Sequence, residues 1–151
     1  MGIYIENVWK PQWAWATAFT NTEQLTPFGG EGSESLVRAS GFTQAENIGF
    51  NIDNTTGIFK TDFSGLYYLN VSASFSDASN EIFSLQFSVD GVALEQGKVK
   101  WTQKGGNWWE VSMALIYQLN GLQQVDVLIT NLGGETSISL KSFTQTMIKL
   151  F

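Results

Sequence analysis

The chain has 151 residues, of which 43% are hydrophobic and 14% aromatic, which suits a single globular domain with its own core. Its formal net charge is −6, which argues against nucleic acid and anionic membranes as partners, because both attract clustered Lys and Arg. It contains neither Cys nor His, so disulfides, the commonest general base and the commonest metal ligand are excluded. The first residues lack the basic start and apolar run of a secretory signal, so we expect none.

The N-terminal segment is rich in tryptophan, with Trp9, Trp13 and Trp15 close together. Exposed together, these side chains would form an apolar patch of the kind that marks interaction surfaces. Pro11 suits an extended arm or an edge strand, because it cannot donate to a sheet ladder. We therefore expect residues 1–18 to form an assembly arm and residues 19–151 to form the folded domain.

Alternation of apolar and polar residues dominates the rest of the chain and predicts half-buried strands. Such rows occur at 66–75, 83–89, 109–119 and 125–129, and a last strand region covers 137–150. Asp90-Gly91 and Asn120-Gly121 predict tight turns. Residues 26–41 and 95–107 are expected to be irregular. No window sustains helical spacing, so the pattern indicates an all-β sandwich or jelly roll.

One segment resembles a known family. Gly57 to Leu69 (Gly-Ile-Phe-Lys-Thr-Asp-Phe-Ser-Gly-Leu-Tyr-Tyr-Leu) is similar to the Gly-x-Phe strand, short turn and Gly-[Leu/Val]-Tyr-[Tyr/Phe] motif of the complement-q globular-head family. That family belongs to the tumour necrosis factor-like jelly-roll superfamily. Leu119 to Val125 resembles its Leu-x-x-Gly-Asp-x-Val motif, with Leu122 in the Asp place, and Ser142 to Ile148 resembles its closing strand without the Gly.

The resemblance covers about residues 45–150. It implies a single jelly-roll sandwich of about ten strands in two antiparallel sheets, assembly as a tight homotrimer, and binding surfaces in place of an enzyme active site.

An aromatic residue on a polar face suggests where a trimer contact would lie. In the 66–75 row, Tyr68 shares its face with Asn70 and Ser72, and its burial between subunits is the best explanation for an aromatic there. We predict a trimer interface formed by Tyr68, Asn70, Ser72 and, from the last strand, Phe143.

A second candidate site is a lysine- and tryptophan-rich stretch. Trp101, Lys104 and Trp108 form a candidate ligand loop, because tryptophan is common at binding hot spots and in sugar-stacking platforms. For the neighbouring Trp109, core packing and an interface role both remain open.

No pattern supports catalysis or a cofactor. Carboxylate pairs are available, but nothing indicates that two acids share a cleft, and there is no Gly-x-Ser-x-Gly elbow. Asp53, Asp62, Asp77 and Asp90, with Asn54 and Asn80, would suit Ca²⁺, but turn-forming roles are favoured because their spacing matches no calcium loop. We expect a protein without enzyme activity, metal or cofactor.

The functional hypothesis combines these features. We expect neither a collagen repeat nor a secretory signal before the domain, and a small trimeric jelly roll of that kind is more like a virion protein, such as those that bacteriophages use. We expect a capsid decoration protein, a cement or head-fibre subunit, on the virion surface and bound to a major capsid or other virion protein. The alternative is a receptor- or glycan-binding module at a phage fibre tip that recognises a host glycan. An acid-pair glycosidase is a third class without a supporting motif.

Overall fold

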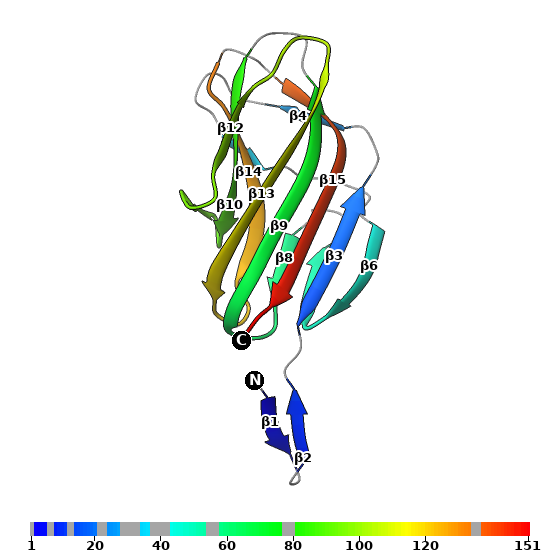
Figure 1. Ribbon diagram of the computed structural model, residues 1–151, viewed down its shortest axis with the longest axis vertical. Helices are drawn as coiled ribbons and strands as arrows, with labels where there is room; N and C mark the ends of the chain where they lie inside the picture. Colours follow the sequence, from blue (N-terminus) through cyan, green and yellow to red (C-terminus); the bar gives the residue numbers. More distant parts are fainter. Residues whose placement is uncertain are drawn as a thin grey trace.

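The computed structural model is built from strands (Figure 1). It describes the backbone of residues 2–5, 8–11, 14–20, 24–27, 34–36, 43–53, 58–76, 81–133 and 137–151, and the side chains of 14–20, 47–53, 58–76, 81–133 and 137–151. No helix occurs within these ranges, as the sequence predicted.

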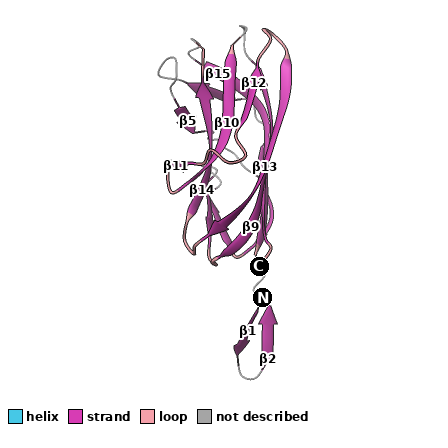
Figure 2. Cartoon of the chain, turned by 60° about the vertical axis from the view of Figure 1, so that its left-hand side comes forward, coloured by secondary structure: helices cyan, strands magenta, loops and turns pink. Residues whose placement is uncertain are grey.

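Two antiparallel sheets form the body. The six-stranded sheet, nearest the viewer in Figure 1 and called the front sheet, has the order β13 (Trp108–Leu119), β9 (Gly65–Ser76), β15 (Ser137–Lys149), β3 (Trp15–Thr20) and β6 (Thr43–Ile48), with β4 (Gln24–Pro27) also on β15. The seven-stranded back sheet has the order β11 (Val92–Ala93), β10 (Ile82–Val89), β14 (Gln124–Asn131), β8 (Ile58–Thr61) and β7 (Phe50–Asp53), with β12 (Val99–Thr102) on β10 and β5 (Glu34–Leu36) on β14. Figure 2 shows the sandwich from another side.

The predicted alternation is clearest in β9. Leu69, Val71 and Phe75 are fully buried between the sheets, whereas Tyr68 and Ser72 lie on the outer face of the front sheet, the face turned away from the back sheet. Neighbouring strands contribute further apolar side chains to one continuous core. The period of two thus places the core correctly along this strand.

A β-bulge in β15 overturns one predicted site residue. The pairing of β15 with β9 shifts between Leu140 and Ser142, so Lys141 is an extra residue in the ladder. The insertion inverts the alternation beyond it, because side-chain direction repeats every two residues. Phe143 therefore points into the core, where it is 1% exposed, and the prediction that it contributes to an outer trimer interface is wrong.

The back sheet confirms the Asp90-Gly91 turn, since both residues have positive φ and the turn joins β10 to β11. The polar side of β10 differs from expectation. Ser84, Gln86 and Ser88, expected to face solvent, are buried, so β10 is covered on both faces.

Two stretches expected to be irregular contain strands. β4 overlaps the start of 26–41, β5 lies within that stretch, and β12 lies within 95–107. In β12, apolar Val99 and Trp101 alternate with Lys100 and Thr102. A strand of four residues gives too short a pattern to recognise from sequence.

The N-terminal boundary also needs correction. β3 is paired on both sides, with β15 and β6, and Ala16 and Ala18 are fully buried. The sandwich therefore includes Ala14, which is 3% exposed, and the predicted arm cannot extend to residue 18. β1 (Gly2–Ile5) and β2 (Val8–Pro11) precede it and pair with each other as a separate two-stranded sheet beyond the end of the sandwich that holds the C-terminus (Figures 1 and 2).

Candidate binding surface

The outer face of the front sheet carries an apolar band that crosses five strands. Strand register places Ile116 opposite Tyr68, Tyr68 opposite Ile148, Ile148 opposite Trp15, and Trp15 opposite Ile48. In this row, directly paired residues project to the same side of the sheet. Five large side chains from β13, β9, β15, β3 and β6 thus form one continuous line, called here the apolar band.

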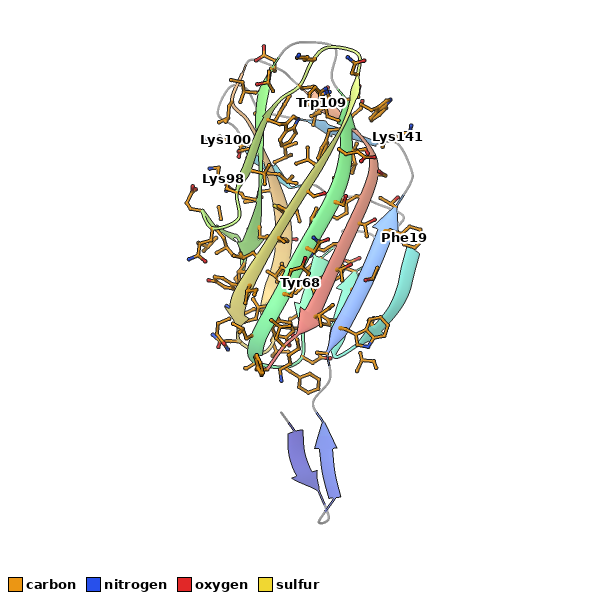
Figure 3. The ribbon with its side chains drawn as sticks, in the orientation of Figure 1. Phe19, Tyr68, Lys98, Lys100, Trp109 and Lys141 are labelled. Carbon is orange, nitrogen blue, oxygen red and sulfur yellow. The ribbon has the colours of Figure 1, made fainter. Side chains whose placement is uncertain are left out.

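The band is open to solvent in the single chain. Ile116 is 56% exposed, Ile48 50% and Ile148 41%, while Tyr68 and Trp15 are half-buried. Figure 3 shows Tyr68 on β9 toward the end of the sandwich that holds the C-terminus. A contiguous exposed patch of this kind is typical of an interaction surface, whereas scattered apolar residues are not.

Small polar side chains fill the next rows of the same face. Asn70 lies beside Ala114 and Thr146, and its Nδ2 donates to the Tyr68 hydroxyl at 3.4 Å. One row further, the hydroxyls of Ser72 and Ser112 lie 3.2 Å apart. The predicted interface residues Tyr68, Asn70 and Ser72 therefore share this outer face with the apolar band.

A hollow lies farther along the same face, near the opposite end of the sandwich. Its volume is about 480 Å³, and it is lined by Ser74, Trp108, Glu110, Lys141 and Ser142. Lys141 Nζ lies 5.2 Å from the centroid of the Trp108 ring, within cation–π range. Trp108 is 41% exposed, so much of the indole remains accessible.

The structure separates the three residues of the predicted ligand loop. Trp108 lines the hollow, but Trp101 belongs to β12 and stacks on Phe75, with ring centroids 5.5 Å apart. The Trp101 indole N–H donates to Gln103 Oε1 at 3.2 Å, which satisfies its polar atom inside the fold. Lys104 is exposed and is absent from the lining of the hollow. Assigning Trp101 to a ligand loop was therefore wrong.

The remaining tryptophans also differ in environment. Trp109 lies in the inward row of β13 but is 36% exposed at the end of the strand, so it is neither a full core residue nor part of the hollow. Trp15 lies in the apolar band and so belongs to the sandwich. Trp9 is in β2, opposite Tyr4, and Trp13 falls outside the described residues.

Several surface residues escaped the sequence analysis. Ile116, Ile148 and Ile48 lie on three different strands and become a group only through strand register. Lys141 and Glu110 join Trp108 for the same reason. Each of these isoleucines is an apolar residue on the otherwise polar face of its strand, and this contrast is the feature of the sequence that could have identified them.

Among the described calcium candidates, Asp90 acts as a turn residue, whereas Asp53 is the last residue of β7. Asp90 accepts from the Gln124 backbone N–H at 2.8 Å and from Gln123 Nε2 at 3.1 Å. Within the described ranges, no three acidic, Cys or His side chains gather closely enough to hold a metal. Asn54, Asp77 and Asn80 lie outside those ranges. Among the residues that can be assessed, no helix has the length and apolarity required to cross a membrane.

Comparison with known proteins rests on structure. No protein-family model matches the sequence, and no curated protein matches it significantly. Solved structures do match. The match to murine APRIL has TM-score 0.62 and 15% identity, and it covers 92% of this chain and 100% of the APRIL chain. Eiger, a tumour necrosis factor from S. frugiperda, has TM-score 0.63 and 15% identity, with 92% and 93% covered. The globular domain of zebrafish complement 1qA has TM-score 0.63 and 12% identity, with 91% and 98% covered. The chain therefore has the jelly-roll fold shared by tumour necrosis factor and the complement 1q globular head, as the sequence predicted.

Proposed function

We propose that the chain is a non-enzymatic structural subunit that assembles as a homotrimer through the outer face of its front sheet and decorates a virus capsid. The apolar band carries the first part of this proposal. Fully burying a large apolar side chain contributes about 1.5–3 kcal/mol, and the band residues are already partly covered, so each gains about half of that on assembly. Five such residues in every subunit offset much of the cost of association.

The surroundings of the band favour a second copy of the same chain as its occupant. On β13, β9, β15 and β3, the two rows on one side of the band hold Ala, Ser, Thr, Asn and Phe19 but no charged residue, whereas the edge strand β6 has Glu46 opposite Thr17. A surface without charge or protruding polar side chains can meet an equivalent surface without burying unpaired ions. Symmetric assembly requires that kind of self-compatibility.

The N-terminal hairpin supports attachment to a larger particle. Within the described residues, β1 and β2 pair only with each other. A single two-stranded hairpin is marginally stable in water, so a partner surface would stabilise it. The arm is now limited to β1 and β2, and its proposed partner is a major capsid or other virion protein. Three arms per trimer would act together, which strengthens attachment without new contacts.

A non-enzymatic role agrees with the chemistry of the hollow. Among the described residues that line it, Glu110 is the one carboxylate. Glycoside hydrolysis commonly uses two carboxylates facing the scissile bond, and these described residues supply one.

A matched pair of isoleucine variants tests the interface. Ile148→Glu places a charge in the apolar band, whereas Ile82→Glu places the same charge at a site of similar exposure, 46% against 41%, in the back sheet. We expect Ile148→Glu to sediment as a monomer and Ile82→Glu to retain the trimer. Equal behaviour of both variants would place the interface elsewhere.

Imaging tests the capsid role. In cryo-electron microscopy of virus particles that carry the protein, we expect threefold-symmetric projections on the capsid surface, oriented with the hairpin toward the shell. Density only at a tail or fibre tip would contradict capsid decoration.

A further inference from the structure

We propose that the hollow around Trp108 binds a neutral pyranose of a polysaccharide or glycan. This inference goes beyond the assembly role and concerns a different part of the outer face. Ser74 lies six residues beyond Tyr68 on β9, which places the hollow about 20 Å from the apolar band at about 3.3 Å per residue.

The bulge in β15 builds the site. Lys141 and Ser142 are consecutive in sequence, yet both line the hollow, because the extra residue breaks the alternation at this point. A regular strand would direct one of them toward the core. Bulges recur where a strand must redirect a side chain toward a site, and this bulge brings an ammonium group over Trp108.

The lining groups match a sugar ring. The exposed indole offers a flat apolar surface for the C–H face of a pyranose, while Glu110 accepts hydrogen bonds and Lys141 donates them. The hydroxyls of Ser74 and Ser142 add groups that both donate and accept. A volume of about 480 Å³ is enough for one or two sugar rings and lies within the range of small-molecule sites.

The charges favour a neutral sugar over an acidic one. The described lining residues include one negative group, Glu110, and one positive group, Lys141, whose ammonium already interacts with the indole. A sugar carboxylate would meet Glu110 and a chain of net charge −6. Hydroxyl groups, in contrast, can use both lining charges as hydrogen-bond partners.

The test compares neutral and acidic probes on matched variants. Oligosaccharides of glucose, galactose, mannose, N-acetylglucosamine and galacturonic acid are screened by saturation-transfer NMR, and binding is quantified by calorimetry. We expect at least one neutral oligosaccharide to bind with millimolar or better affinity and to bind more tightly than galacturonate oligosaccharides. Trp108→Ala should weaken binding about tenfold or more, which corresponds to the loss of one aromatic stacking contact.

Trp109→Ala is the matched control, because this neighbouring tryptophan is similarly exposed but lies outside the hollow. It should change the dissociation constant by less than about twofold. Absence of binding by every neutral probe, tighter binding of the acidic sugar, or equal losses in the two variants would overturn the proposal.

Oligomeric mass is measured on the same samples. If the unmodified protein binds no sugar and the Trp108→Ala variant loses the trimer, the hollow is a subunit contact and the sugar site is overturned. Sugar binding by the monomeric Ile148→Glu variant would support the site independently of trimer formation. The two proposals therefore fail separately.

Discussion

The hydroxyl groups of Tyr67 and Thr61 lie 2.7 Å apart inside the turn that joins β8 to β9. The Tyr67 hydroxyl also donates to the Phe63 carbonyl at 2.7 Å, and the Phe63 backbone N–H donates to Thr61 Oγ1 at 3.2 Å. Tyr67 is fully buried, so the first tyrosine of the Gly-Leu-Tyr-Tyr motif stabilises the turn from within the core. The second, Tyr68, points to the apolar band.

Tyr67→Phe should lower the free energy of unfolding by about 1–2 kcal/mol, because it removes the hydroxyl from a buried hydrogen-bond network. For a domain of this size, that corresponds to a fall in Tm of about 2–8 °C. Calorimetry of the two proteins at neutral pH checks this value. An unchanged Tm would mean that the hydroxyl does not stabilise the turn.

The same residue predicts a pH effect. Burial raises the pKa of Tyr67, the hydrogen bond from Thr61 partly opposes the shift, and the nearby Asp62 adds to it. The folded state therefore holds the proton more tightly than the unfolded state. This contribution is fully present below the ordinary tyrosine pKa of about 10 and is lost as the pH rises above it. Urea melts between about pH 8 and about pH 11 should show a smaller loss of stability for Tyr67→Phe than for the unmodified protein.

Gly65→Ala should destabilise the fold, because a Cβ at this position would collide with the Phe151 carbonyl oxygen. That oxygen accepts from the Leu66 N–H at 3.0 Å and attaches the C-terminus to β9. We expect a loss of about 2 kcal/mol or more in urea unfolding. Gly106→Ala is the control: Gly106 has φ +75° but open space around it, so only backbone strain of about 1 kcal/mol should appear.

Leu122→Gly should stabilise the protein by about 0.5–1 kcal/mol. Leu122 has φ +70° in the turn before β14, which is unfavourable for a branched side chain, and it is 65% exposed, so little packing is lost. Leu132 does not have a positive φ, so Leu132→Gly should destabilise the protein instead. A loss of stability in both variants would contradict the strain at Leu122.

Deletion of residues 2–11 should leave the sandwich folded. The hairpin forms its own sheet, and Ala14 is the first buried residue among the side chains that the structure describes. We expect an unchanged unfolding transition together with loss of attachment to the particle. Precipitation or a large fall in Tm would show that the hairpin stabilises the sandwich.

The sequence predicted the elements whose pattern is long and regular. β9 spans twelve residues with strict alternation, so its buried face and the outward position of Tyr68 follow directly from period two. The Asp90-Gly91 turn was predictable because its two residues tolerate positive φ.

The remaining features depend on contacts between distant segments. Lys141 and Ser142 interrupt the alternation between Leu140 and Phe143, but only the pairing of β15 with β9 shows that this interruption is a bulge that inverts the last strand. Ile116, Ile148 and Ile48 come together only when the strand order is known. Trp101 was assigned to a loop because lysines surround it, but its ring packs against the core from β12.

The central claim is self-assembly through the apolar band, and the mass of the unmodified chain in solution tests it most directly. Multi-angle light scattering at micromolar concentration should give three times the 16.7 kDa chain mass. A mass of 16.7 kDa under the same conditions would contradict the account.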